Sequence, residues 1–123
     1  MFSHQDLITR IAGAYRRLGF DTALHNPDAG APLVLRGEEF DPDLTVLQGG
    51  RAIRVIAVET HRSLGAASAL RWRALERSGI SLFIYVPETL WGEAWTLKFE
   101  NRVGGELRSV ESDGLVPVGK ESA

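Results

Sequence analysis

Apolar residues recur every three or four positions near the start of the chain, beginning at Leu7 and Ile11. This spacing is typical of the buried face of an amphipathic helix. Ser3 and Asp6 have the spacing of a capping box, with aspartate in place of the usual glutamate. Gly19 follows the last apolar position and is a natural stop. We therefore expect a first helix between Ser3 and Gly19.

The middle of the chain predicts a β-hairpin. Two runs rich in β-branched and aliphatic residues, at 44–47 and 52–58, flank the pair Gly49-Gly50. Apolar residues occupy both faces of these runs, as in a sheet that is covered on both sides. Before the hairpin, LVLRG at 33–37 predicts another short strand, and the stretch 21–32 is rich in turn-forming residues.

A second helix and a central strand are expected after the hairpin. Ser63 is expected to cap a helix that runs to about Ser78 and stops at Gly79. Trp72, within this helix, is expected to pack in the core. The expected buried stripe is narrow and consists of Leu64, Ala67, Leu70 and Ala74. The apolar run SLFIYVP at 81–87 predicts a strand parallel to the one before the helix, because a strand, helix, strand unit in one sheet needs a crossover.

The last part of the chain predicts one more hairpin. The runs AWTLKF at 94–99 and ELRSV at 106–110 flank Gly104-Gly105. Trp91 and Trp95 are expected to cover an edge of the sheet, and a homodimer formed through this hairpin is the alternative.

Length and composition fit a single folded unit. A chain of 123 residues with 44% hydrophobic residues can bury one core, so we expect one α/β domain over residues 1–118 with a mixed sheet, and a frayed tail at 119–123. A net charge of −2 gives no general attraction to nucleic acid or anionic membrane, so such a partner would have to meet a local basic patch.

The lack of cysteine excludes disulfides and thiolate metal sites. No stretch approaches the ~18 apolar residues of a membrane span, and the opening MFSHQDL lacks a signal-peptide pattern. We expect a cytoplasmic protein with no membrane partner.

Polar side chains stand at the ends of the two hairpin strands. Asp43 opens the first strand, Glu59 closes the second, and His61 lies two positions further on. Side chains alternate along a strand, so the turn decides whether the three share a face. A three-residue loop places Asp43 opposite Ala57 and puts all three on one face. A two-residue turn at Gly49-Gly50 would point Asp43 to the other face.

Carboxylates that share a face would form a cation site. Oxygen donors gathered in this way suit a hard divalent ion such as Mg²⁺ or Mn²⁺. An ion so placed can polarise a phosphodiester and lower the pKa of a bound water. The alternative is that each acid is only a solvated residue at a strand end.

The chain resembles the PD-(D/E)xK nuclease superfamily, which has restriction-endonuclease-like and Holliday-junction-resolvase-like folds. The resemblance is carried by Pro42-Asp43, the sixteen-position step to Glu59, the arginine-bearing helix that follows, and the order of elements from Ser3 to Val86. It implies a restriction-endonuclease-like αβββαβ core with a mixed sheet flanked by helices, to which the predicted C-terminal β-hairpin is added.

The resemblance also implies a metal site. Asp43 and Glu59 would be ligands of Mg²⁺ or Mn²⁺, with the backbone carbonyl of Thr60 as a third. Some members add an acid from the first helix, and Asp6 is the candidate here. His61 stands where the motif has lysine. An imidazole with an ordinary pKa of about 6.5 is mostly neutral at pH 7, so His61 would assist the attacking water as a base or act as a ligand.

Two functions stay open from the sequence. The first is metal-dependent hydrolysis of nucleic acid, with DNA favoured, through Asp43, Glu59 and His61. The second is a nuclease-like fold without hydrolysis that binds nucleic acid or a protein partner, as a homodimer if the tail hairpin pairs. The candidate phosphate contacts lie on or beside the second helix and are Arg62, Arg71 and Arg73, for which a solvated surface is the alternative. His4 and His25 are expected to be ordinary surface or turn residues.

Overall fold

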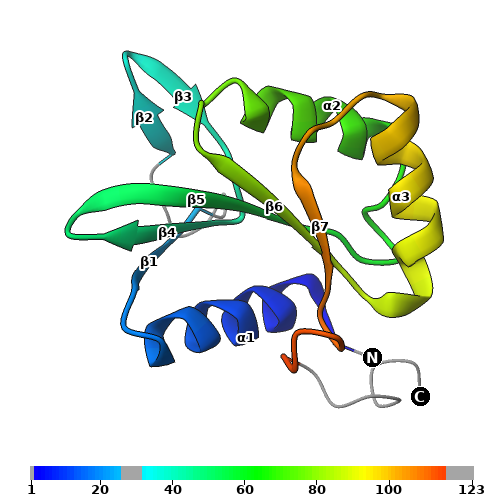
Figure 1. The fold of residues 1–123 in the computed structure, drawn as a ribbon, viewed down its shortest axis with the longest axis horizontal. Helices are drawn as coiled ribbons and strands as arrows, with labels where there is room; N and C mark the ends of the chain where they lie inside the picture. Colours follow the sequence, from blue (N-terminus) through cyan, green and yellow to red (C-terminus); the bar gives the residue numbers. More distant parts are fainter. Residues whose placement is uncertain (1, 26–31, 116–123) are drawn as a thin grey trace.

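The computed structural model describes residues 2–25 and 32–115 and shows an α/β fold in which helices flank a five-stranded mixed sheet (Figure 1). The elements follow in the order α1 (His4–Arg17), β1 (Asp21–Leu24), β2 (Leu33–Leu35), β3 (Glu38–Phe40), β4 (Leu44–Gln48), β5 (Arg51–Val58), α2 (Ala66–Glu76), β6 (Ser81–Val86), the short 3₁₀ helix η1 (Glu88–Leu90), α3 (Trp91–Glu100) and β7 (Glu106–Ser109). The tail expected at 119–123 lies outside the described residues.

The sheet has the strand order β1-β4-β5-β6-β7. The pairs β1–β4 and β4–β5 are antiparallel, whereas β5–β6 and β6–β7 are parallel. The sequence predicted the parallel pair on either side of the second helix, and this is confirmed. The strands β2 and β3 form a separate antiparallel hairpin between β1 and β4 in the chain.

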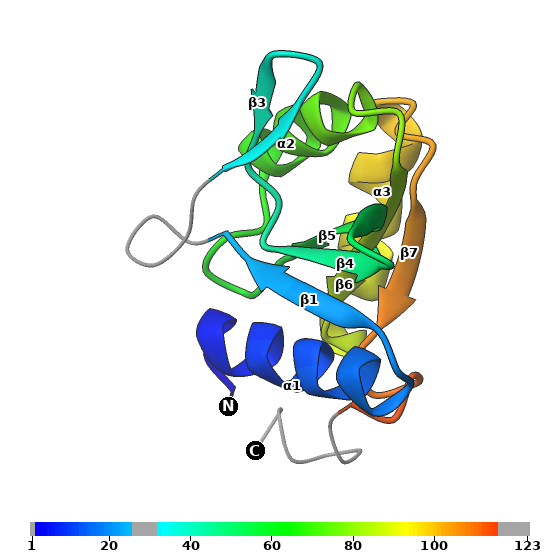
Figure 2. The same ribbon diagram turned by 90° about the vertical axis from the view of Figure 1, so that its left-hand side faces the viewer.

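Both faces of the sheet are covered, as the apolar residues on both faces of the hairpin strands predicted. One core lies between α1 and the sheet and contains Leu7, Ile8, Ile11, Tyr15, Leu44, Val46, Ile56, Val58 and Tyr85. The other lies between the sheet and the pair α2 and α3, and contains Val55, Ala57, Trp72, Leu75, Ile84, Val86, Ala94 and Leu107. Figure 2 shows α1 on one side of the central strands and α2 and α3 on the other.

The first helix begins at the predicted capping box. The backbone N–H of Asp6 donates to Ser3 Oγ, and the backbone N–H of Ser3 donates to Asp6 Oδ2, both at 3.1 Å. Gly19, with φ of 97°, follows the helix end. The carboxylate of Asp6 therefore holds the cap at an exposed position. Within residues 2–25 and 32–115, each helix falls short of the length and apolar character that a bilayer span needs.

The turn between β4 and β5 is not the three-residue loop that would place Asp43 and Glu59 on one face of the sheet. Gly49 and Gly50 alone form it, with φ of 59° and 77°, values that favour glycine in a two-residue hairpin turn. The register then shifts between Val46 and Leu47, as in a β-bulge.

The bulge restores the strand register that places the acids on one face of the sheet, although the turn has only two residues. Beyond it Leu44 pairs with Ile56, and the backbone N–H of Asp43 donates to the carbonyl of Ile56 at 2.9 Å. This register, continued by one position, puts Asp43 beside Ala57. The two-residue alternative is the turn that forms, but the register at the acid end is the one that the three-residue loop implied.

The second helix is shorter than predicted and turns a different face to the core. It begins after Gly65 rather than at Ser63, and Leu70 of the predicted buried stripe is 72% exposed. The helical residues that are buried instead are Ser68, Ala69, Trp72 and Leu75. The large ring of Trp72 fixes this face, and its predicted core position is confirmed.

The predicted C-terminal β-hairpin is wrong. Residues 91–100 form α3, and β7 runs parallel to β6. A helical period was present in this segment, because Leu90, Ala94 and Leu97 are three or four positions apart and pack towards the sheet. The β propensity of the aromatic residues and the glycine pair concealed it.

The glycine pair at 104–105 serves a close approach between elements rather than a turn. A Cβ atom on Gly105 would lie 2.8 Å from the Leu82 side chain, so β7 could not reach its place beside β6 with a larger residue there. The backbone N–H of Gly104 donates to Glu76 Oε2 at 2.8 Å and joins the strand entry to α2.

Candidate functional site

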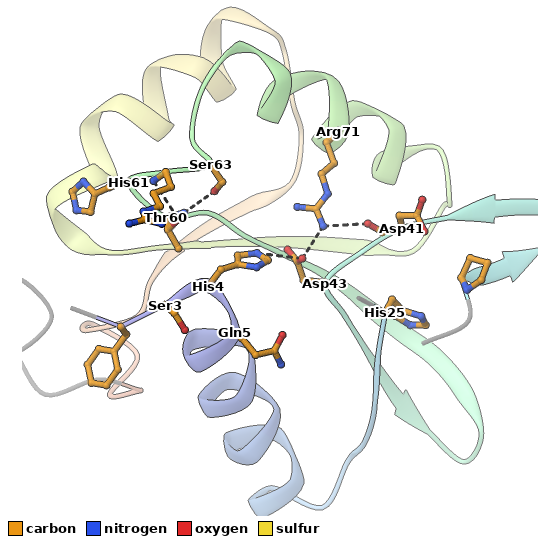
Figure 3. A pocket seen from close by; sticks show the side chains of 13 residues that line it. Ser3, His4, Gln5, His25, Asp41, Asp43, Thr60, His61, Ser63 and Arg71 are labelled. Carbon is orange, nitrogen blue, oxygen red and sulfur yellow. Dashed lines mark hydrogen bonds and ion pairs between the residues drawn. The ribbon is translucent and has the colours of Figure 1, made fainter. Parts of the chain in front are cut away.

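A cleft of about 1240 Å³ opens where β4 begins and β5 ends (Figure 3). Its walls come from the first turn of α1, the segment before β4, the loop after β5, and α2. The polar side chains that line it are Ser3, His4, Gln5, His25, Asp41, Asp43, Thr60, His61, Arg62, Ser63 and Arg71. Among the candidate residues from the sequence, the structure brings five to this cleft, namely Asp43, Thr60, His61, Arg62 and Arg71.

Asp43 lies at the floor of this cleft and is 8% exposed. Its Oδ2 accepts the backbone N–H of Val58 at 2.7 Å, so the side chain bridges the start of β4 to the end of β5. Its Oδ1 lies 3.0 Å from Arg71 Nη2 and 3.3 Å from His4 Nε2. The carboxylate therefore contacts two cationic or potentially cationic groups from two different helices.

Glu59 is 2% exposed and lies behind the cleft. Its Oε1 accepts the hydroxyls of Ser63 at 2.8 Å and Ser68 at 3.2 Å. Its Oε2 accepts the indole N–H of Trp72 at 3.0 Å. These partners are all donors, which is the pattern of an ionised carboxylate. The buried face of α2 is thus the wall that holds Glu59.

Arg71 lies between the two acids. Its Nη2 contacts Asp43 Oδ1 at 3.0 Å, and its Nη1 is 3.7 Å from Glu59 Oε2. Nη2 also donates to the backbone carbonyl of Asp41 at 3.1 Å. Figure 3 shows Arg71 reaching down from α2 to Asp43 and Asp41. Asp43 and Glu59 therefore come close enough to share one cation, and that cation is a guanidinium.

His4 completes the cluster, although the sequence indicated an ordinary surface residue. Its Nε2 lies 2.9 Å from the carbonyl oxygen of Val58 and 3.3 Å from Asp43 Oδ1. Both neighbours accept hydrogen bonds, so Nε2 carries a hydrogen and has no lone pair for a metal. The capping box predicted that His4 opens the helix. Which strand end the first turn meets depends on tertiary packing, so the sequence held no signal for this contact.

The geometry shifts the pKa of both partners. The hydrogen bond to Asp43 raises the pKa of His4 above its ordinary 6.5, against the opposing effect of burial. For Asp43, burial alone would raise the pKa. The hydrogen bond from His4 and the charge of Arg71 outweigh burial, and the pKa of Asp43 falls below 3.8. Both shifts favour the ionised pair.

The other predicted residues are more distant from the acids. The ring of His61 is exposed, its Nε2 lies 3.1 Å from Thr89 Oγ1, and Figure 3 shows it pointing away from Asp43. Arg62 is exposed on the same loop and lines the cleft. Arg73 is exposed on α2 and is not among the residues that line the cleft. His25, at the far side, has its Nε2 2.7 Å from Thr45 Oγ1.

The expected metal ligands do not fit a divalent ion as they are arranged. The four carboxylate oxygens of Asp43 and Glu59 already contact protein donors. The carbonyl of Thr60 accepts the backbone N–H groups of Ser63 at 3.1 Å and Leu64 at 3.0 Å. Within the described ranges, no group of three or more His, Cys, Asp or Glu side chains could hold a metal ion. Binding of Mg²⁺ or Mn²⁺ stays a prediction, and it would require Arg71 to move.

Comparison with protein-family models, with curated proteins and with solved structures finds no match to this chain.

Replacement of Arg71 should destabilise the fold, because it leaves two buried carboxylates without their cation. We expect Arg71→Met to lower the free energy of unfolding by about 2 kcal/mol, measured by urea denaturation. Arg73→Met, an exposed change on the same helix, should stay within about 0.5 kcal/mol of the wild type. Equal losses in the two variants would show that Arg71 does not compensate the acids.

The contact between His4 and Asp43 should make stability depend on pH. Because the pKa of His4 is raised in the folded state, its contribution is fully present below about pH 6.5 and is lost as pH rises through the folded value. The stability difference between wild type and His4→Gln should therefore be largest below about pH 6.5 and shrink as the pH rises above that value. Thermal unfolding across this range measures it.

His61→Gln is the control, since it removes an imidazole that contacts Thr89 instead of an acid. The advantage at acidic pH should survive that change. A difference between wild type and His4→Gln that does not vary with pH would contradict the assignment.

Proposed function

We propose that the chain is a nuclease-like module whose cleft binds nucleic acid, with DNA favoured, and that hydrolysis is not its main activity. The observation that carries this proposal is the position of Arg71. A single guanidinium contacts Asp43 and lies 3.7 Å from Glu59, where a metal-dependent nuclease would need a divalent ion.

The order of elements supports the nuclease-like part of the proposal. A helix precedes three antiparallel strands, β1, β4 and β5, and the helix α2 and the parallel strand β6 follow. Apart from the separate hairpin of β2 and β3, this order is similar to the αβββαβ core implied by the resemblance to the PD-(D/E)xK superfamily, with β1 in the place expected for the strand at 33–37. Asp43 and Glu59 stand at neighbouring strand ends of this unit, as the resemblance requires of its acids.

The basic and imidazole side chains of the cleft support binding of an anionic chain, although Asp41 and Asp43 line the cleft as well. Arg62 is exposed on the rim, and His4, His25 and His61 line the same cleft. The chain as a whole has a net charge of −2, so attraction of phosphate groups must come from a local patch of this kind. Arg71 cancels part of the charge of the acids, which would otherwise repel a phosphate.

Metal-dependent hydrolysis is the second candidate, because Asp43 and Glu59 lie within reach of one cation. Carboxylate oxygens in such a pair are of the type that Mg²⁺ and Mn²⁺ prefer. The carboxylate oxygens of this pair already contact protein donors, an arrangement that does not fit such an ion. His61, expected to assist the attacking water, contacts Thr89.

Binding to nucleic acid should depend on Arg62 more than on Arg73. In fluorescence anisotropy with a short labelled DNA duplex and with single-stranded DNA, Arg62→Ala should weaken binding about 3–10-fold. It should also reduce the slope of log affinity against log salt by about 0.9, the effect of one lost phosphate contact. Arg73→Ala is the matched control, since Arg73 is an exposed arginine outside the cleft, and it should change neither quantity appreciably. Absence of binding at low salt would overturn the proposal.

Plasmid nicking separates the two candidate functions. With Mn²⁺ or Mg²⁺ added, the wild type should show no more nicking than Asp43→Asn or Glu59→Gln, because Arg71 holds the place of the ion. Nicking that needs the metal and disappears in both variants would establish hydrolysis as the function. The anisotropy measurements above would still report whether the cleft binds nucleic acid.

A further inference from the structure

The outer face of α3 carries an apolar stripe away from the cleft. The stripe consists of Trp91, Trp95 and Phe99, which are 37%, 49% and 70% exposed. They are four positions apart, so they lie along one face of the helix. The rings of Trp95 and Phe99 stack, with centroids 5.2 Å apart and an interplanar angle of 16°. The opposite face of the helix packs on the sheet through Ala94, which is fully buried.

The size of the stripe indicates an interface. Aromatic side chains of this size expose, at these fractions, roughly 350 Å² of apolar surface per chain. Patches of a few hundred square ångströms are often functional on soluble proteins. Tryptophan is among the residues most enriched where binding energy concentrates in protein interfaces.

The charges at the two ends of α3 are complementary to each other. Glu88 and Glu93 lie at the N-terminal end. Lys98 and Arg102 lie at the C-terminal end, with Glu100 as the one acid among them. A second α3 laid antiparallel along the stripe and centred on Trp95 would bring Glu88 of each copy to Arg102 of the other, whereas Glu93 lies about 160° from Trp95 around the helix. The dipoles of the two helices would also point in opposite directions, which is electrostatically favourable.

We propose that the chain forms a two-fold symmetric homodimer through α3, centred on Trp95. In an antiparallel pair centred there, Trp95 faces its own copy, and Trp91 faces the partner's Phe99. A two-fold axis makes both halves of the contact identical, as in most homodimers. The surface is thus complementary to itself in charge, through Glu88 of one copy and Arg102 of the other.

A second cleft, whose lining residues are mostly polar or charged, adjoins the stripe. This cleft, of about 680 Å³, lies beside Trp91, between the start of α3 and β7, and Gly92 and Leu107 are among its lining residues. The two-fold arrangement brings the partner's Phe99 to Trp91, at the edge of this cleft.

The occupant is a second copy rather than a lipid surface. Helices that lie on membranes carry lysine and arginine beside their apolar face, since most membranes present anionic lipids. On α3 the one lysine, Lys98, is outnumbered by Glu93 and Glu100, and Glu88 precedes the helix. The rings of two copies would bury roughly 700 Å², less than stable complexes do, so the dimer is expected to be weak.

Sedimentation equilibrium of the full chain tests the dimer. The wild type should shift from monomer to dimer between about 5 and 500 μM, and Trp95→Lys should remain a monomer throughout. Leu70→Lys is the matched control, because Leu70 is a 72% exposed apolar residue on α2, outside the stripe. It should dimerise like the wild type. Circular dichroism confirms that each variant is folded.

A mixture of charge variants tests the two-fold axis at Trp95. Trp95→Lys and Trp95→Glu should each be monomeric alone and should form a heterodimer when mixed, because position 95 of one copy faces position 95 of the other. A monomeric wild type at the highest concentration, or a Trp95→Lys variant that dimerises like wild type, overturns the proposal. So does binding of the wild type, but not of Trp95→Lys, to phosphatidylcholine and phosphatidylserine vesicles without self-association. Failure of the dimer would leave nucleic-acid binding in the cleft unaffected.

Discussion

The ion pairing of Arg71 with Asp43 and Glu59 is the interaction on which the candidate site depends. Glu59 is 2% exposed, and a buried carboxylate without a cation or donors would be strongly destabilising. Arg71 comes from α2 and contacts Asp43 before β4 and the backbone of Asp41. One guanidinium thus holds α2 against both strand ends.

Local signals were enough to predict most of the element order. The capping box at Ser3, the glycine pair at Gly49 and the apolar run at 81–87 each reported a feature of their own short segment, and each is present in the structure. Asp43 and Glu59 were identified as candidates because they stand at the ends of predicted strands. Alternation of side chains along a strand then predicts which face of the sheet each acid occupies. Their common neighbourhood, however, resulted from a β-bulge after Val46, and no residue near Val46 predicted it.

The predictions failed where tertiary packing overrode local pattern. Leu70 looked like a core residue, but burial of Trp72 beside Glu59 turned α2 so that Leu70 faces solvent. Arg71 was a candidate phosphate contact, with a solvated surface position as the alternative, and its guanidinium contacts acids contributed by two other elements. His4 lies 54 positions from the Val58 carbonyl that it contacts. Periodicity and propensity within a window of ten or so residues carry no information about such contacts.

The charges of the cluster imply that the cleft responds to its own protonation state. Two ionised carboxylates and one guanidinium leave one negative charge, which His4 cancels only when its ring is protonated. The contact with Asp43 raises the pKa of His4. Mildly acidic pH therefore favours the state in which this cluster of side chains has no net charge. If the cleft binds nucleic acid as proposed, a phosphate and the proton on His4 favour each other, because linkage between two ligands is reciprocal. A divalent ion would supply a fixed charge in this place, whereas the pair of Arg71 and His4 supplies one that varies with pH.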